Sequence, residues 1–367
     1  MTALLPGRRR LGVMLSAIAM LAAVLTWWAD GPASALVVQP MVVGGMPASG
    51  AQDPWQVVIV GREHPGRFLC GGVLISPVLV LTAGHCLPDR GTLKGWAIYA
   101  GSTHVVPTAA SWQVLDGERL HVAPRRFWRA PHFDVPTLSD DFGLIELATP
   151  AASTPIKIAG PAERRAWSAG STALVSGFGY TTQNARRSSG VLREVQVPVD
   201  ADSTCARAYG RRFRRTVMLC AGPMSGARDA CSGDSGGPLE VSLAAPSTDP
   251  GAAPKRQRLV GLVSWGVGCG RPNHPGVYTR VAGRSIVAQL RTIMVDDAGL
   301  DPATVFGAGL RLPSCGQVEH RITALRSDLH AAALVRPALG HRGKASETRR
   351  TENRLSYLSD LRPRVCR

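Results

Sequence analysis

The sequence predicts an all-β fold from Val42 to about Val241. Short apolar runs, such as residues 55–60, 72–81 and 144–147, recur along this stretch. Gly, Pro, Asp and Ser separate the runs, as is typical of the turns between short antiparallel strands. The composition supports a packed core, because 45% of the 367 residues are hydrophobic.

Two features mark the end of this β region. Residues 242–258 form a polar, proline-bearing insert between two apolar runs, and we expect an exposed hairpin loop there. Residues 285–294 then carry Ile286, Val287, Leu290 and Ile293 at helical spacing. The spacing predicts a terminal helix, and the β domain is expected to end near residue 295.

Residues 296–367 differ in composition from the β region, because they are rich in arginine and their pattern is partly helical. Ile322, Leu325 and Leu329 could form an apolar stripe. The stretch is too short to form an independent hydrophobic core without added stabilisation, and a disordered tail is the alternative. A disulfide between Cys315 and Cys366 could supply this stabilisation, and an intermolecular disulfide is the alternative. The role of this basic extension is left open.

The N-terminus has the layout of an export signal. Three arginines at 8–10 precede an apolar run at 11–28, and Ala33 and Ala35 fit a small-x-small cleavage site. We expect a signal peptide over residues 1–35, a secreted protein and no stable membrane association. An uncleaved anchor is the alternative, and the type of export signal stays open. The eight cysteines then indicate disulfides formed in an oxidising compartment.

The charge is strongly positive, with 42 basic against 26 acidic side chains and a net charge of +16. Arginine supplies all but four of the basic residues, which indicates a GC-rich coding bias and a bacterial source of actinobacterial type. A basic surface attracts acidic partners. No nucleic-acid partner is expected, because the sequence has no basic helix, zinc-finger spacing or aromatic RNA-binding motif.

Three short runs carry the groups that peptide hydrolysis needs. They are Leu81–Cys86 with His85, Asp140–Leu147 with Asp141, and Gly233–Pro238 with Ser235. Together they offer a base, an orienting carboxylate and a nucleophile. Taken alone, His85 could be a packed histidine or a metal ligand. No metal site is expected, because no second histidine or carboxylate lies at ligand spacing.

With Val42–Gly45 and Ser264–Gly266, these runs closely resemble the chymotrypsin/trypsin family of serine proteases. The resemblance covers about residues 42–295, with the motifs in the family's order. It implies two six-stranded antiparallel Greek-key β-barrels with the active site between them and a C-terminal helix. We also expect a monomer.

The resemblance assigns the catalytic roles. Ser235 is the nucleophile, His85 takes its proton, and Asp141 holds His85 in the productive tautomer. Asp140 is expected to be a solvated neighbour. The backbone amides of Gly233 and Ser235 are expected to form the oxyanion hole.

The resemblance also implies a specificity pocket between residues 229–235 and 264–268, with Asp229 at its base. A buried carboxylate demands a cationic partner, so we expect Arg or Lys on the acyl side of the cut bond. Ala230 lacks a hydroxyl that would help bind an ammonium, which favours Arg over Lys. A surface position for Asp229 is the alternative. The expected pocket residues are Asp229, Ala230, Ser264, Trp265, Gly266, Gly268 and Gly276.

In the resembling family, cleavage before the Val-Val-Gly-Gly run frees an amino group that pairs with the aspartate beside the nucleophile. Here these are Val42 and Asp234, and the propeptide is residues 36–41. Met41 precedes the cut, so an activating protease other than this one is expected.

Cysteine pairs follow from the same resemblance. They are Cys70 with Cys86, Cys205 with Cys220, and Cys231 with Cys269, which leaves Cys315 and Cys366. The sequence lacks an acidic ladder between Gly91 and Glu118, so calcium is unsupported and no cofactor is expected.

Two other functions fit parts of the sequence. Gly233–Gly237 also satisfies the nucleophile motif of α/β-hydrolases, but the residues after Ser235 cannot readily start the helix that this fold requires. A catalytically silent protease-like binding or regulatory protein would normally have lost Ser235 or His85. The sequence therefore favours a secreted serine endopeptidase zymogen that acts on polypeptides.

Overall fold

The computed structural model describes residues 42–48, 53–61, 69–108, 111–183, 188, 190–243, 256–310, 313–335 and 342–366. The expected signal peptide and propeptide, residues 1–35 and 36–41, lie outside the described residues. So do residues 244–255 of the expected hairpin loop.

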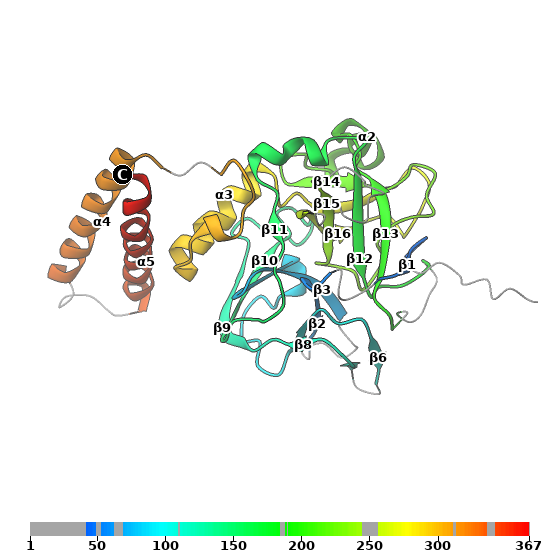
Figure 1. Ribbon diagram of the computed structural model, residues 1–367, viewed down its shortest axis with the longest axis horizontal. Coiled ribbons are helices and arrows are strands. Elements are labelled where there is room, and N and C mark those ends of the chain that lie inside the picture. The colour runs from blue at the N-terminus through cyan, green and yellow to red at the C-terminus, as the bar shows by residue number, and fades with distance from the viewer. Residues whose placement is uncertain are drawn as a thin grey trace, which may run out of the picture. The chain divides into compact units, whose positions relative to one another are not determined.

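The first half of the chain forms a seven-stranded antiparallel sheet in the order β8-β5-β2-β3-β4-β10-β9 (Figure 1). Strand β2 is buried along its whole length, and β3 nearly so, because both faces of the sheet are covered. The strands are β2 (Gln56–Val60), β3 (Leu69–Ser76), β4 (Leu79–Thr82), β5 (Ala97–Ala100), β8 (Glu118–Arg119), β9 (Val122–Arg129) and β10 (Gly143–Leu147).

The second half forms an eight-stranded sheet in the order β1-β13-β12-β15-β16-β17-β14, with β11 paired to β16 (Figure 1). The pairing of β11 with β16 is parallel and the others are antiparallel. The strands are β1 (Met46–Pro47), β11 (Lys157–Ile158), β12 (Thr172–Gly177), β13 (Arg193–Pro198), β14 (Met218–Ala221), β15 (Pro238–Ser242), β16 (Gln257–Trp265) and β17 (Gly276–Thr279). A separate two-stranded sheet joins β6 (Val105–Pro107) to β7 (Trp112–Val114).

The strand counts exceed the expected six per barrel because of three two-residue strands. Without β8 the first sheet has six strands, and without β1 and β11 the second also has six. The observed sheets of seven and eight strands therefore differ from the expected barrels of six by these short strands. The short ones are pairings of loop segments, which the apolar pattern could not reveal.

The two sheets share one apolar core. Leu79 and Leu81 of β4 pack in the same cluster as Leu259 and Leu262 of β16, together with Leu290 of helix α3. His85 follows β4, while Asp141 precedes β10 and Ser235 precedes β15. The shared core thus brings strand ends from both sheets to one place.

The predicted terminal helix is confirmed as α3 (Arg284–Thr292), and a π-helical segment, η4 (Ile293–Ala298), extends it. Further helices are α2 (Asp202–Tyr209), α4 (Cys315–Val335) and α5 (Arg342–Val365), with short 3-10 turns at η1 (Gly84–Cys86), η2 (Pro161–Trp167), η3 (Gly210–Arg212) and η5 (Pro302–Thr304). No helix in the described ranges has the length and apolar character needed to cross a membrane.

The C-terminal extension forms a helical hairpin of α4 and α5. Val318 and Ile322 of α4 pack against Leu358 and Leu361 of α5. Leu325 is only partly buried in this cluster, and Leu329 of the expected stripe is not part of it. A disulfide between Cys315 and Cys366 joins the two ends, so a stretch too short for a large core is closed covalently.

Candidate active site

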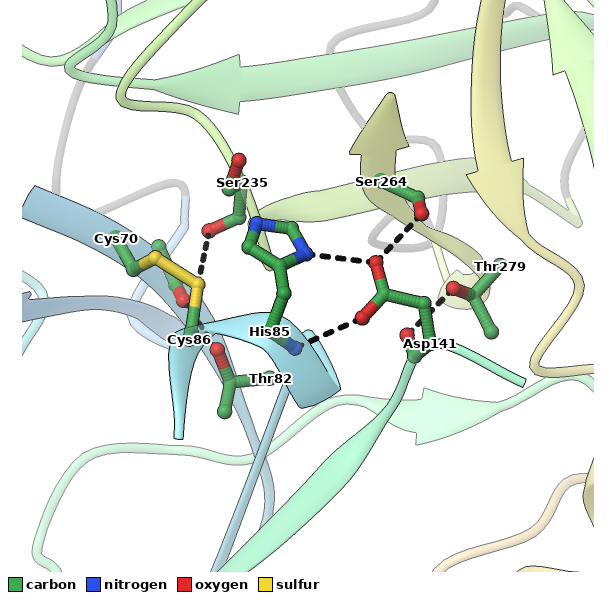
Figure 2. Close-up of polar contacts among 9 residues, drawn as sticks. Cys70, Thr82, His85, Cys86, Asp141, Ser235, Ser264 and Thr279 are labelled. Carbon is green, nitrogen blue, oxygen red and sulfur yellow. Dashed lines mark hydrogen bonds and ion pairs between the residues drawn. A yellow bond between two sulfur atoms is a disulfide. The ribbon is translucent and has the colours of Figure 1, made fainter. Parts of the chain in front are cut away.

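His85 and Asp141 form a closely bonded pair. His85 Nδ1 lies 2.8 Å from Asp141 Oδ2, and the His85 backbone N–H donates to Asp141 Oδ1 at 2.9 Å (Figure 2). Asp141 is fully buried, whereas the His85 side chain is 26% exposed. A buried carboxylate on Nδ1 leaves Nε2 as the ring nitrogen free to exchange a proton with substrate.

Two hydroxyls from the second sheet hold Asp141 from the other side. Ser264 Oγ donates to Asp141 Oδ2, and Thr279 Oγ1 donates to the Asp141 carbonyl oxygen, both at 2.6 Å (Figure 2). The sequence assigned Ser264 only to the pocket wall and did not single out Thr279. Nothing in the local pattern indicated these bonds, because the partners lie more than 120 residues apart.

Asp140 was expected to be a solvated neighbour, and this expectation is wrong. Only 8% of Asp140 is exposed. Its carboxylate accepts hydrogen bonds from Ser139 Oγ and from Gln289 Nε2 of α3. Both oxygens are therefore occupied by groups other than His85, and Asp141 alone bonds the histidine.

Ser235 lies beside the His85 ring (Figure 2). Its carbonyl oxygen accepts a hydrogen bond from the Gly71 backbone N–H at 2.8 Å, which ties the loop to β3 of the first sheet. No hydrogen bond joins Ser235 Oγ to His85 among the described contacts. Such bonds are often long in a free enzyme and shorten when substrate binds.

Glycines shape the loop around Ser235. Gly233 has φ +98° and Gly236 has φ +82°, values that L residues rarely adopt. A Cβ at position 236 would also lie 2.3 Å from Thr82 Oγ1. The close approach to β4, and with it the position of Ser235 beside His85, therefore requires glycine.

A cavity of about 240 Å³ adjoins Ser235, and all seven expected pocket residues line it. Asp229 is 3% exposed, which excludes the surface alternative. Its Oδ2 accepts a hydrogen bond from the Gly270 N–H at 2.9 Å, while Oδ1 is buried with no partner among the described residues. Burial raises the pKa of Asp229 to about 7.

Gly276 keeps Asp229 accessible. A Cβ at position 276 would lie 2.5 Å from Asp229 Oδ1, so any side chain there would fill the space beside the free oxygen. The sequence missed Gln183 and Tyr278, which also line the cavity. Gln183 carries no local signal, because it comes from a loop remote in sequence from the other lining residues.

Comparison with known proteins decides the family. Residues 42–287, two thirds of the chain, match the family described as Trypsin. The chain belongs to the trypsin family. That membership implies the fold of two β-barrels.

Three relatives of this trypsin-family chain are mammalian serine proteases. It is 37% identical to human "Serine protease 56" over 246 residues, which cover 66% of this chain and 37% of that protein. The mouse protein of the same name is 36% identical over 256 residues, covering 69% and 39%. Rat "Transmembrane protease serine 9" is 36% identical over 248 residues, covering 66% and 21%.

The chain thus matches between about a fifth and two fifths of the length of these relatives. The expected bacterial source finds no support among them. Arginine usage follows base composition, which does not identify a kingdom.

Asp234, next to Ser235 in this trypsin-family chain, is fully buried. Its oxygens accept hydrogen bonds from the backbone N–H groups of Gly179, at 2.7 Å, and Cys231, at 2.8 Å. Burial raises the pKa of Asp234 to about 6. In the described part of the chain no cation pairs with Asp234, and no hydrogen bond joins it to Val42.

Val42 is buried, and the next residue bonds the pocket directly. The Asp229 backbone N–H donates to the Val43 carbonyl oxygen at 3.1 Å. The start of the trypsin-family domain is therefore connected to the loop that carries Asp229.

All four disulfides are present: Cys70–Cys86, Cys205–Cys220, Cys231–Cys269 and Cys315–Cys366. The disulfide between Cys315 and Cys366, for which an intermolecular bond was the alternative, is therefore intramolecular. Cys70 and Cys86 gather near His85, and Cys315 and Cys366 near Glu319, at distances that a metal could bridge. These cysteines are disulfide-bonded and do not supply thiolate ligands.

Proposed function

We propose that this chain is a serine endopeptidase that cleaves polypeptides after Arg, and less efficiently after Lys, through an acyl-enzyme. Catalytic roles for His85, Asp141 and Ser235 are supported by the His85–Asp141 pair and by the position of Ser235 beside the ring. Family membership supports the reaction class.

In the proposed reaction, Ser235 Oγ attacks the scissile carbonyl while His85 Nε2 accepts its proton. Asp141 fixes the His85 tautomer through Nδ1 and stabilises the imidazolium. The backbone N–H groups of Gly233 and Ser235 stabilise the oxyanion. His85 then passes the proton to the leaving amine, and water releases the acyl group from Ser235 by the same steps in reverse order.

The free, buried Oδ1 of Asp229 is the observation that carries the proposed specificity. Leaving a buried carboxylate unpaired is costly, and a guanidinium in the cavity would both pair with it and fill the space beside Gly276. Arginine also offers a planar pair of donors that suits a carboxylate. Ala230 supplies no hydroxyl for a lysine ammonium, which supports the preference for Arg.

We further propose that the protein is a secreted zymogen. The unpaired, buried Asp234 is suited to a new α-amino group at Val42, and the Val43–Asp229 bond would transmit that insertion to the pocket. Met41 does not fit a cut by an Arg-specific protease, so another protease would act. The disulfides support an oxidising compartment.

The direct test uses protein processed to begin at Val42. A fluorophosphonate probe should label the wild type but not Ser235→Ala, and a peptide library should show cuts after Arg ahead of Lys. Asp141→Asn should lose most activity, whereas the matched Asp140→Asn should keep it. An inert wild type would instead support a protease-like binding protein, and active protein that begins elsewhere would overturn the activation scheme.

A further inference from the structure

A second cavity, of about 780 Å³, is lined by arginines and by no carboxylate among the described residues. Its wall combines η2, the segment after η3, the segment after β17 and helix α3. The five arginines are Arg164, Arg215, Arg280, Arg284 and Arg291. Positive charge this concentrated is electrostatically unfavourable unless an anion offsets it.

Few of these charges are compensated within the protein. Arg280 forms a salt bridge with Asp202, the one such bridge among the five in the described part of the chain. Arg164 donates to the Trp167 carbonyl oxygen. Burial and the charge of Arg280 lower the pKa of Arg164 overall, although the charge of Asp202 acts in the opposite direction. Arg291 hydrogen-bonds Tyr357, which carries no negative charge to offset it.

Arg215 and Arg284 are exposed and have no hydrogen-bond or acidic partner among the described contacts. Their guanidinium groups are therefore available to a ligand. Substituting both therefore breaks no hydrogen bond or ion pair among the described residues.

Two further donors belong to the same wall. Helix α3 begins at Arg284 with neither a capping side chain nor an acidic residue in its first turn, so the positive end of its dipole adds to the field. Trp167 is 4% exposed, and its indole Nε1–H has no acceptor in the described structure. Guanidinium groups, helix terminus and indole together favour a ligand made of anionic acceptors.

The side chains around the arginine cavity argue against nucleic acid and against a lipid layer as its ligand. Arg164 covers the Trp167 ring at 3.7 Å, so the wall offers no open aromatic face on which a nucleic-acid base could stack. The large apolar side chains that are exposed in the described structure, Met46, Val106, Leu115, Val135 and Met224, do not line this cavity, so nothing there would enter a lipid layer. Disulfides indicate an oxidising, extracellular setting.

We propose that this arginine cavity binds a sulfated polysaccharide, with Arg215 and Arg284 as the principal sulfate ligands. Planar guanidinium groups bind sulfate oxygens in pairs. The cavity shares no lining residue with the pocket around Asp229. A bound polysaccharide would therefore hold the protein on a sulfated matrix with the Asp229 pocket open.

The test compares two double variants of the full chain in a Ser235→Ala background, so that the outcome does not depend on the proposed activity. Arg215→Ala/Arg284→Ala removes two charges from the cavity. Arg326→Ala/Arg349→Ala removes two exposed charges from the α4–α5 hairpin and is the matched control. Affinity for heparin is measured by titration at several salt concentrations, and melting temperatures verify folding.

We expect the cavity variant to bind heparin about tenfold more weakly or worse, with the slope of log affinity against log salt reduced by roughly one to two. The control should change less than twofold. Equal losses in both variants, or no loss in the cavity variant, would overturn the proposal. So would tighter cavity-dependent binding to duplex DNA or to phosphatidylserine vesicles than to heparin.

Discussion

Ser264 Oγ donates a 2.6 Å hydrogen bond to Asp141 Oδ2, the oxygen that also faces His85 Nδ1 at 2.8 Å. Asp141 precedes β10 of the first sheet, whereas Ser264 belongs to β16 of the second. The bond therefore fixes the carboxylate across the junction of the two sheets. The orientation of His85 depends on both sheets being correctly packed.

Ser264→Ala should lower kcat about tenfold with a smaller change in KM, because the loss falls on the alignment of Asp141 and not on the Asp229 pocket. Steady-state kinetics on an arginyl peptide measure both constants. Ser264→Thr keeps a hydroxyl and should recover part of kcat. A change confined to KM would show that Ser264 acts only as pocket wall.

The pKa of Asp229 predicts a pH dependence of ligand binding. Because burial raises that pKa to about 7, the carboxyl is increasingly protonated as the pH falls below 7 and loses its attraction for a cation. In Ser235→Ala protein, the Kd for benzamidine should therefore rise between pH 8 and pH 5, approaching tenfold per pH unit. Isothermal titration calorimetry at each pH measures this.

Asp229→Asn is the control for that experiment, since it removes the titrating group and leaves Asp234 in place. Its binding should be weak and nearly independent of pH. A pH slope that survives in Asp229→Asn would assign the effect to another group.

Glu240 predicts a pH-dependent stability. It is fully buried on β15, and burial together with Asp53 and Glu194 raises its pKa well above the usual range; burial also raises the pKa of Asp53 to about 7. The folded state therefore retains protons that the unfolded state loses above about pH 4, and stability falls as pH rises toward 7 and beyond. Glu240→Gln should raise the melting temperature at pH 8 by roughly 2–4 °C.

The gain should shrink toward pH 5, where Glu240 is protonated in the folded wild type. Calorimetric or fluorescence melting across this range is the measurement. The exposed Glu352→Gln should leave the melting temperature unchanged at both pH values. A Glu240→Gln variant that melts lower than wild type at pH 8 would contradict the argument.

Arg354 and the buried Asp296 form one of three described ion pairs between the α4–α5 hairpin and residues 296–301, beside Arg350–Asp297 and Arg364–Asp301. Arg354 bonds both Asp296 oxygens, and the Asn353 side chain donates to the Asp296 carbonyl oxygen. Arg354→Ala leaves this carboxylate buried and unpaired, which should cost about 1–2 kcal/mol. The value is below that of a fully buried pair because the Arg354 side chain is 46% exposed.

Limited proteolysis after residue 299 should accelerate in Arg354→Ala but not in the exposed Arg349→Ala. Arg354→Ala/Asp296→Ala should recover part of the loss, since the unpaired charge is gone. If the double variant is no more stable than Arg354→Ala, the ion pair does not hold the hairpin.

Much of the site could be predicted because it is encoded in short runs. The resemblance placed Ser235, His85 and Asp141 from motifs of three to eight residues, and it placed the seven pocket residues within or near those motifs. The structure gathers the pocket residues around one cavity beside Ser235. The terminal helix followed from apolar spacing alone. Such features depend on local sterics and periodicity, which a linear sequence displays directly.

Asp140 shows what the linear pattern could not reveal. It looked like a solvated neighbour because only its adjacent residues were visible, yet Gln289 of α3 reaches it from 149 positions away. The Ser264 and Thr279 bonds to Asp141 were missed for the same reason.

By itself, the sequence predicted a nucleophile, its base, an orienting carboxylate and a charged pocket. Tertiary structure alone decided that Asp140 is buried and bonded to Gln289 and that Asp229 keeps one oxygen free. It also decided that five arginines from η2, the segments after η3 and β17, and α3 line one cavity. Those outcomes depend on contacts between distant segments, which form only when the two sheets bury a shared core.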